Sequence, residues 1–108
     1  MAAYGGASFN VGGKERPEAI LGAIVAPGFF SILRVQPAFG RTFSPEEDHS
    51  GEEHVVILGH TIWRDHFGAD PGILGRNIVL NGETYRVIGV MSPKFKFPDW
   101  AQLWVPMA

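Results

Sequence analysis

The sequence predicts an α+β domain in which a mixed, mainly antiparallel sheet is combined with short helices. Its apolar segments are short, and 14 glycines and 8 prolines supply many turns between them. An Asn-Gly pair, Asn81-Gly82, lies between two apolar segments, which is the preferred composition of a tight antiparallel hairpin. Strands and helices do not alternate regularly, as they would in a doubly wound parallel sheet. The length of 108 residues fits a single domain, residues 1–108, whose core needs no disulfides.

The N-terminal third is expected to form two antiparallel strands and a helix. Residues 7–11 alternate apolar and polar side chains, and residues 12–17 contain glycines and a proline that reverse the chain. Residues 18–26 are rich in Ile, Val and Ala, which is typical of a strand. A helix of two turns is predicted at residues 27–33, where two phenylalanines precede a leucine at helical spacing.

The middle of the chain carries two helix-start patterns around a buried strand. Residues 44–48 read Ser-Pro-Glu-Glu-Asp, with a capping serine, a proline at the first helical position and carboxylates in the first turn. Residues 54–58 lack alternation and predict a strand buried on both faces. A helix is expected at residues 59–67, ended by Gly68, and a single further turn at residues 70–75.

The hairpin is the clearest local signal. Residues 77–80 and 83–91 are its predicted strands. Strict alternation in the second strand places Val87 on the face opposite to Ile88 and Val90, so that one face forms core. The remaining residues are expected to run extended as far as a closing Leu-Trp-Val-Pro segment.

Charge and composition exclude several classes of function. The net charge is −2 and the basic residues are scattered singly, so nucleic acid is not an expected partner. The absence of cysteine excludes disulfides, thiolate metal sites and cysteine nucleophiles. The longest uncharged run, residues 19–33, is too short to cross a bilayer, and we expect no spanning segment and no secretory signal in residues 1–108.

No catalytic, cofactor-binding or metal-ligating residue is predicted. Residues 46–54 concentrate carboxylates and two histidines, but adjacent pairs of carboxylates point apart and do not match an EF-hand loop. We interpret them as a solvated acidic loop, with a metal site as the alternative. His60 and His66 are six residues apart, which is not the spacing of two zinc ligands on one helix face. His60 is expected to start the helix, and His66 to lie at the surface or half-buried.

Most of the aromatic residues are expected to form the core, but one aromatic segment is an exception. Lys94, Phe95, Lys96 and Phe97 alternate on an extended segment, which places both rings on one side and suits docking against a neighbouring surface. Together with Trp100 they form the candidate interaction surface. A small-molecule or peptide binding module that uses this surface remains the alternative function.

Several segments follow one another in a recognisable order along nearly the whole chain. The first is PGFFSILRVQPAFGRTF at residues 27–43, followed by the acidic residues 46–48. The others are residues 54–60, Trp63, Phe67-Gly68, Asp70-Pro71, Gly75-Arg76, residues 80–82, residues 87–91 and residues 103–106. This ordered set resembles the MacB-like periplasmic core domain of FtsX-like and MacB-like ABC transporter permeases.

This resemblance implies an extracytoplasmic, non-catalytic fragment of a larger permease. The chain would supply the outer, sabre-like subdomain of that region, on the periplasmic or extracellular face of the bacterial inner membrane. The implied partners are the remainder of the permease, its cytoplasmic ATPase subunit or domain, a periplasmic adaptor and a second copy in a homodimer. No cofactor is implied.

Overall fold

The computed structural model describes residues 4–11, 18–25, 30, 34–41, 54–95 and 100–106. The predicted turn at residues 12–17, the helix start at residues 44–48 and all but one residue of the helix predicted at 27–33 lie outside these ranges. Within them, no helix is long and apolar enough to cross a membrane.

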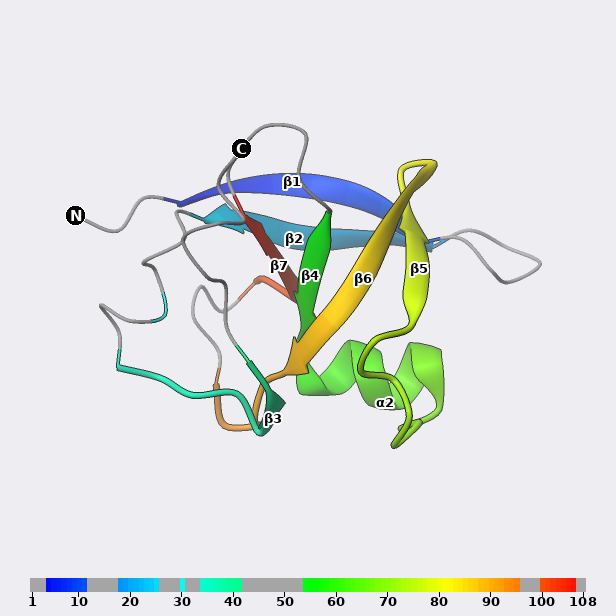
Figure 1. Ribbon diagram of the computed structural model, residues 1–108. Helices are drawn as coiled ribbons and strands as arrows, with labels where there is room; N and C mark the ends of the chain where they lie inside the picture. Colours follow the sequence, from blue (N-terminus) through cyan, green and yellow to red (C-terminus); the bar gives the residue numbers. More distant parts are fainter. Residues whose placement is uncertain are drawn as a thin grey trace.

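The described strands form one sheet in the order β3-β6-β4-β7-β2-β1-β5 (Figure 1). Their bounds are β1 Tyr4–Val11, β2 Glu18–Val25, β3 Phe39–Gly40, β4 Val55–Leu58, β5 Asn77–Leu80, β6 Glu83–Val90 and β7 Leu103–Pro106. The β2–β7 and β4–β6 pairs are parallel, and the other pairs are antiparallel. The predicted α+β fold with a mixed, mainly antiparallel sheet is therefore confirmed.

The sheet closes on itself because β5 pairs with both β6 and β1. The closure is uneven. β1 pairs with β2 along its whole length, from Tyr4 opposite Val25 to Val11 opposite Glu18. By contrast, β1 meets β5 only where Val11 lies opposite Leu80. The strands thus form a ring. Neighbouring strands are paired over several residues around most of it, but β1 and β5 are joined by a single residue pair.

The β5–β6 hairpin is formed as predicted. Its turn residues Asn81 and Gly82 have φ angles of 53° and 78°, which are the left-handed values that a type I′ turn requires. Asn81 also joins the hairpin to β1. Its backbone N–H donates to the Asn10 carbonyl at 2.9 Å, and its side-chain Oδ1 accepts from the Asn10 N–H at 2.8 Å.

The strict alternation predicted for β6 is wrong in its second half. Val56 of β4 lies opposite Val87, but Ile57 lies opposite Gly89, so Ile88 is an extra residue in a bulge. The bulge turns Val90 to the same side as Val87, while Ile88 packs on the other side. Both faces are buried here because separate core clusters cover them.

The helix α2, His60–Phe67, follows β4 and ends at Gly68 in the left-handed conformation, as predicted. His66 was expected at the surface or half-buried, and this is wrong: its exposed fraction is 7%. Ile62 and His66 are four residues apart and share the buried face of the helix. His66 is therefore carried into the interior by the periodicity that buries Ile62.

The segment after α2 forms two consecutive turns in place of the predicted single helical turn. The Ile73 N–H donates to the Asp70 carbonyl at 3.2 Å, and the Arg76 N–H donates to the Ile73 carbonyl at 3.0 Å. The Asp70 side chain accepts from the Gly72 N–H at 2.8 Å. This carboxylate acts as the predicted cap, but the chain then turns into β5.

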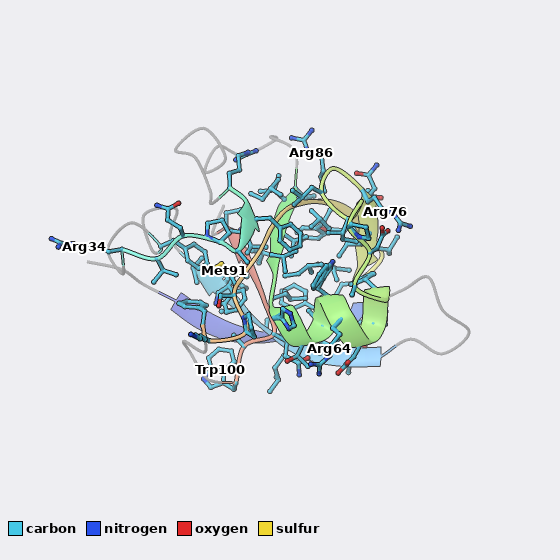
Figure 2. The ribbon with its side chains drawn as sticks, turned by 90° about the horizontal axis from the view of Figure 1, so that it is seen from below. Arg34, Arg64, Arg76, Arg86, Met91 and Trp100 are labelled. Carbon is cyan, nitrogen blue, oxygen red and sulfur yellow. The ribbon has the colours of Figure 1, made fainter. Side chains whose placement is uncertain are left out.

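The core consists of two clusters on opposite sides of the sheet. An inner cluster fills the ring and receives Ile62 of α2, together with Leu58, Leu80, Val87 and Leu103. An outer cluster is built around Phe30, Met91 and Trp104. Figure 2 shows the labelled arginines projecting around the periphery, whereas Met91 lies within the molecule, where none of it is exposed.

Candidate interaction site

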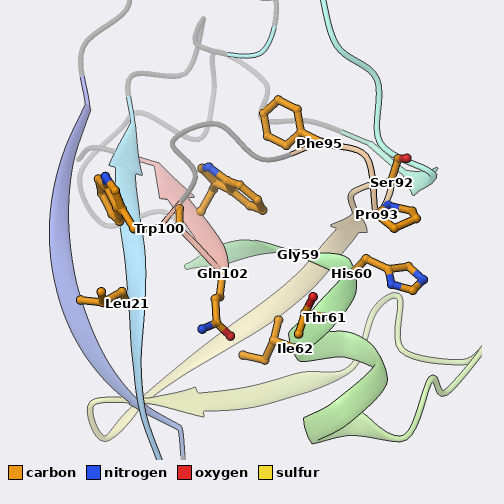
Figure 3. A pocket seen from close by; sticks show the side chains of 12 residues that line it. Leu21, Gly59, His60, Thr61, Ile62, Ser92, Pro93, Phe95, Trp100 and Gln102 are labelled. Atoms are coloured by element: carbon orange, nitrogen blue, oxygen red, sulfur yellow. The ribbon is translucent and has the colours of Figure 1, made fainter.

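A groove of about 430 Å³ opens beside the outer cluster, between β2, the start of α2 and the segments that flank β7 (Figure 3). Its lining is mainly aromatic and aliphatic, with hydroxyl, amide and imidazole groups at the sides. The lining residues are Leu21, Gly59, His60, Thr61, Ile62, Ser92, Pro93, Phe95, Trp100, Ala101, Gln102 and Trp104. They come from four separate stretches of sequence.

Backbone hydrogen bonds hold the walls of this groove together. The Gln102 N–H donates to the Leu21 carbonyl at 2.9 Å, and the Gly59 N–H donates to the Gln102 carbonyl at 2.8 Å. A Cβ atom at Gly59 would lie only 2.8 Å from that same carbonyl oxygen, so this position requires glycine. β2, the approach to β7 and the start of α2 are thereby fixed relative to one another.

Trp100 forms one wall of the groove and lies over β1. A Cβ atom at Gly6 would lie 3.0 Å from the Cη2 atom of the Trp100 ring, so the absence of a side chain at Gly6 makes room for the indole. Trp100 is 36% exposed and Leu21 beside it is 51% exposed. Figure 3 shows both side chains on the β2 side of the groove. Together they form an exposed apolar patch that suits contact with another surface.

Phe95 forms the opposite end of the groove and is part of the outer cluster. Its ring centroid lies 5.8 Å from that of Phe30 and 5.3 Å from that of Trp104. Lys94 is exposed, and its N–H donates to the Ser92 hydroxyl at 3.1 Å in a tight turn. The structure thus brings Phe95 and Trp100 to one groove and leaves Lys94 outside its lining. Lys96 and Phe97 lie outside the described residues.

The sequence analysis did not include Leu21, Thr61 and Gln102 in the interaction surface. Each residue is unremarkable in its own segment, and only the pairing of β2 with β7 and the placement of α2 bring them together. Leu21 is exposed although its strand is rich in apolar residues, and nothing in the sequence of residues 18–26 marks it apart from its buried neighbours.

The chain as a whole matches one protein family. The model of the MacB-like periplasmic core domain matches residues 1–108. The chain belongs to this family. The predicted resemblance is confirmed, and with it the periplasmic or extracellular location of the domain at the bacterial inner membrane.

Curated relatives and solved structures agree with the family. The chain is 37% identical over 70 residues to the macrolide export ATP-binding/permease protein MacB of Bdellovibrio bacteriovorus, and 36% identical over 74 residues to that of Azoarcus sp.. These matches cover 65% and 68% of the chain but only 10% and 11% of the relatives. The chain therefore spans about a tenth of the length of these MacB proteins.

Two solved structures share the fold. The extracellular domain of the ABC-type transporter YknZ from Gram-positive bacteria superposes with a TM-score of 0.77 at 22% identity. The periplasmic region of MacB from Actinobacillus actinomycetemcomitans superposes with a TM-score of 0.73 at 20% identity. Each match covers 97% of this chain, and 52% and 46% of the respective structures.

The geometry of the MacB-like domain offers no metal centre in the part of the chain that the structure describes. Most of the acidic loop at residues 46–54 lies outside that part, and His54 is the one member placed. Its ring stacks on Tyr85 with centroids 5.0 Å apart, and its Nε2 lies 3.6 Å from Glu83. Burial, assisted by the charge of Glu83, raises the pKa of Tyr85.

Proposed function

We propose that this MacB-like domain is a non-catalytic fragment of the extracytoplasmic region of an ABC transporter permease. In this role it couples cytoplasmic ATP hydrolysis to export or to mechanical transmission across the membrane. The observation that carries the proposal is the family match over residues 1–108, supported by a fold shared with the extracytoplasmic regions of two ABC-type transporters.

The partners follow from that role. They are the remainder of the permease, its cytoplasmic ATPase subunit or domain, a periplasmic adaptor and a second copy of the permease. We propose that Lys94, Phe95, Lys96, Phe97 and Trp100 form the contact surface for one of them. The groove supports this assignment because Trp100 stands exposed at its wall and Phe95 is held firmly by two aromatic neighbours.

The first experiment examines the reading frame and neighbouring genes in the source genome. The proposal expects apolar helices of about 20 residues on both sides of this domain, together with an ATPase encoded in the same or an adjacent reading frame. A reading frame with no such helices would overturn the proposal.

A second experiment tests the groove in the intact transporter, reconstituted with its ATPase. Trp100→Ala is expected to lower coupled transport while ATP hydrolysis in detergent stays unchanged, because the residue lies in a domain that contacts no nucleotide. Leu74→Ala is the matched control, since Leu74 is 39% exposed and lies outside this groove. Equal transport by both variants would show that the groove is not required for coupled transport.

The second candidate function is that of a small-molecule or peptide binding module. The groove favours it, because about 430 Å³ lies within the range of small-molecule pockets and its walls combine aromatic rings with polar groups. Titration with the neutral dye N-phenyl-1-naphthylamine distinguishes the two functions. Saturable binding that is lost in Trp100→Ala and kept in Leu74→Ala supports the binding module, and unsaturable fluorescence argues against it.

A further inference from the structure

The turn of the β5–β6 hairpin contains a carboxamide and a backbone nitrogen that can react with each other. Asn81 and Gly82 are both exposed, and the turn follows the point where β5 meets β1 (Figure 1). A Cβ atom at Gly82 would meet no other atom within 4 Å, and the Gly82 N–H makes no hydrogen bond within the described part of the chain. The nitrogen of Gly82 is therefore accessible.

An asparagine followed by glycine is prone to deamidation, because the glycine offers no side chain that hinders ring closure. The Gly82 nitrogen forms a bond to Cγ of Asn81 and loses its proton, while the Cγ–Nδ2 bond breaks and the side-chain nitrogen leaves as ammonia. Water then opens the cyclic imide at Cγ, which gives aspartate, or at the main-chain carbonyl carbon, which gives isoaspartate. Water is the only co-reactant, and no carbon is oxidised or reduced.

Hydrogen bonds to β1 hold Asn81 in a conformation that does not react. Its Oδ1 accepts from the Asn10 N–H at 2.8 Å, and its Nδ2 donates to the Ser8 carbonyl at 3.5 Å. Its backbone N–H donates to the Asn10 carbonyl at 2.9 Å. Attack by Gly82 requires rotation of the side chain about Cα–Cβ and of the main chain about Cα–C. These rotations break the bonds to β1, so the reaction has to wait until they open.

We propose that Asn81 is a site of spontaneous deamidation and that its hydrogen bonds to β1 control the rate of the reaction. β1 and β5 are joined by one residue pair, Val11 opposite Leu80, so this junction can open while the rest of the sheet stays folded. Each opening releases the carboxamide of Asn81. Because ammonia leaves, every conversion is irreversible.

The two products no longer fit the junction. In aspartate a carboxylate oxygen replaces the Nδ2 donor, and it faces the Ser8 carbonyl with no proton between them. In isoaspartate the main chain runs through the former side chain and gains a methylene group, so the two-residue type I′ turn is lost. Deamidation therefore weakens the one contact that closes the ring between β1 and β5.

The first test follows the folded 108-residue chain in mildly alkaline buffer at body temperature. Trypsin releases residues 77–86, and mass spectrometry detects the gain in mass when oxygen replaces the amide nitrogen. We expect conversion at Asn81 and much slower conversion at Asn77 and Asn10, because these two precede β-branched residues that crowd the nitrogen. Equal conversion at the three asparagines, or none at Asn81, overturns the proposal.

The second test asks whether β1 restrains the reaction. Asn10→Pro removes the N–H that donates to Asn81 and leaves the bonds between β1 and β2 intact, because both backbone groups of Asn10 bond Asn81. Asn10→Ala, the matched control, keeps this N–H. We expect Asn10→Pro to accelerate conversion at Asn81 about fivefold, the factor for one ordinary hydrogen bond. Equal rates in the two variants overturn the restraint by β1.

A measurement on the unchanged chain does not depend on the folding of the proline variant. In concentrated urea the junction is absent, whereas in the folded chain its open form is a minor state. Asn81 is therefore expected to convert at least roughly tenfold faster in urea. Equal rates in urea and in the folded chain overturn the proposal.

The last test examines the product. The deamidated chain carries an additional negative charge, so ion exchange separates it from the unchanged chain. Hydrogen exchange at the Asn10 amide should be faster in it, because this amide loses its place beside the turn. Asn77→Asp is the matched control, since it adds the same charge on β5 at the end away from the turn. Unchanged exchange at Asn10 in the deamidated chain, or equal acceleration in the control, overturns the opening of the ring.

Discussion

The β5–β6 hairpin and β1 differ in how completely their backbone groups are paired. Within the hairpin, β6 is paired along both edges, by β4 on one and by β5 and β3 on the other, whereas β5 meets β1 only at Leu80. β1 is equally regular along β2, but among the described residues its other edge bonds β5 and Asn81 only between Ser8 and Val11. Regular pairing along one edge of a strand therefore does not imply pairing along its other edge. The hairpin and β1 meet at Leu80 and Asn81, and substitutions at this junction test how much it contributes to stability.

The largest effect is expected from Leu80→Ala. Leu80 is fully buried in the inner cluster and lies opposite Val11 at the junction. Its truncation leaves a cavity and should cost about 3 kcal/mol of the free energy of unfolding. Urea denaturation followed by tryptophan fluorescence measures this loss. Val79→Ala, which truncates the exposed neighbour on the same strand, should cost much less, and an equal loss would show that the junction is not packed as described.

Two substitutions at Asn81 distinguish the contribution of the β5–β6 turn from that of the hydrogen bonds between Asn81 and β1. Asn81→Gly keeps the left-handed φ but removes the side-chain bonds to β1, whereas Asn81→Ala also places a Cβ atom in an unfavourable conformation. We expect a loss of about 1 kcal/mol for the glycine variant and about 2 kcal/mol for the alanine variant. Hydrogen exchange at the Asn10 amide should accelerate in both. Unchanged exchange at Asn10 would mean that Asn81 does not hold the ring closed.

Gly82→Ala affects the turn alone. Gly82 has a φ of 78° and a Cβ atom there would meet no other atom within 4 Å, so the cost is conformational and should be about 1 kcal/mol. Thermal unfolding measures it. The Asn10 amide should keep its protection relative to the global stability, which distinguishes this variant from Asn81→Ala. A selective loss at Asn10 would contradict the separation of turn and junction.

The smallest effect concerns pH and the loop that leads into β5. The Gly72 N–H, followed by Arg76, lowers the pKa of Asp70. A lowered folded-state pKa contributes stability above the unfolded value of about 3.9, and this stability is lost as the pH falls through the folded value. Asp70→Asn should therefore lower the melting temperature slightly at pH 7. The difference from the unchanged chain should shrink below about pH 4, and a difference that grows on acidification would refute this account.

Local patterns predicted much of the fold because the physical causes are local. The Asn-Gly turn, the glycine that ends α2 and the unbroken apolar run of β4 each act within a few residues, and the structure contains all three. The errors occurred where a distant segment intervenes. The bulge at Ile88 depends on the register that β4 imposes, and the burial of His66 depends on where the sheet receives α2.

The residues of the candidate site likewise fall into those that the sequence indicated and those that only the structure brings together. Phe95 and Trp100 were recognised because aromatic residues beside prolines and lysines are conspicuous in a sequence. Leu21, Thr61 and Gln102 join them only through strand pairing and the hydrogen bonds at Gly59.

The family, the α+β class and the position of the hairpin could be predicted from the amino-acid sequence alone, because an ordered set of turns and apolar segments carries that information. The closure of the sheet into a ring, and its dependence on the junction between β1 and β5, are visible only in the three-dimensional arrangement of the described strands. The physical reason is that hydrogen bonds between strands join residues far apart in the chain. Asn10 and Asn81 illustrate this, since neither residue carries a local sign that it will bond the other.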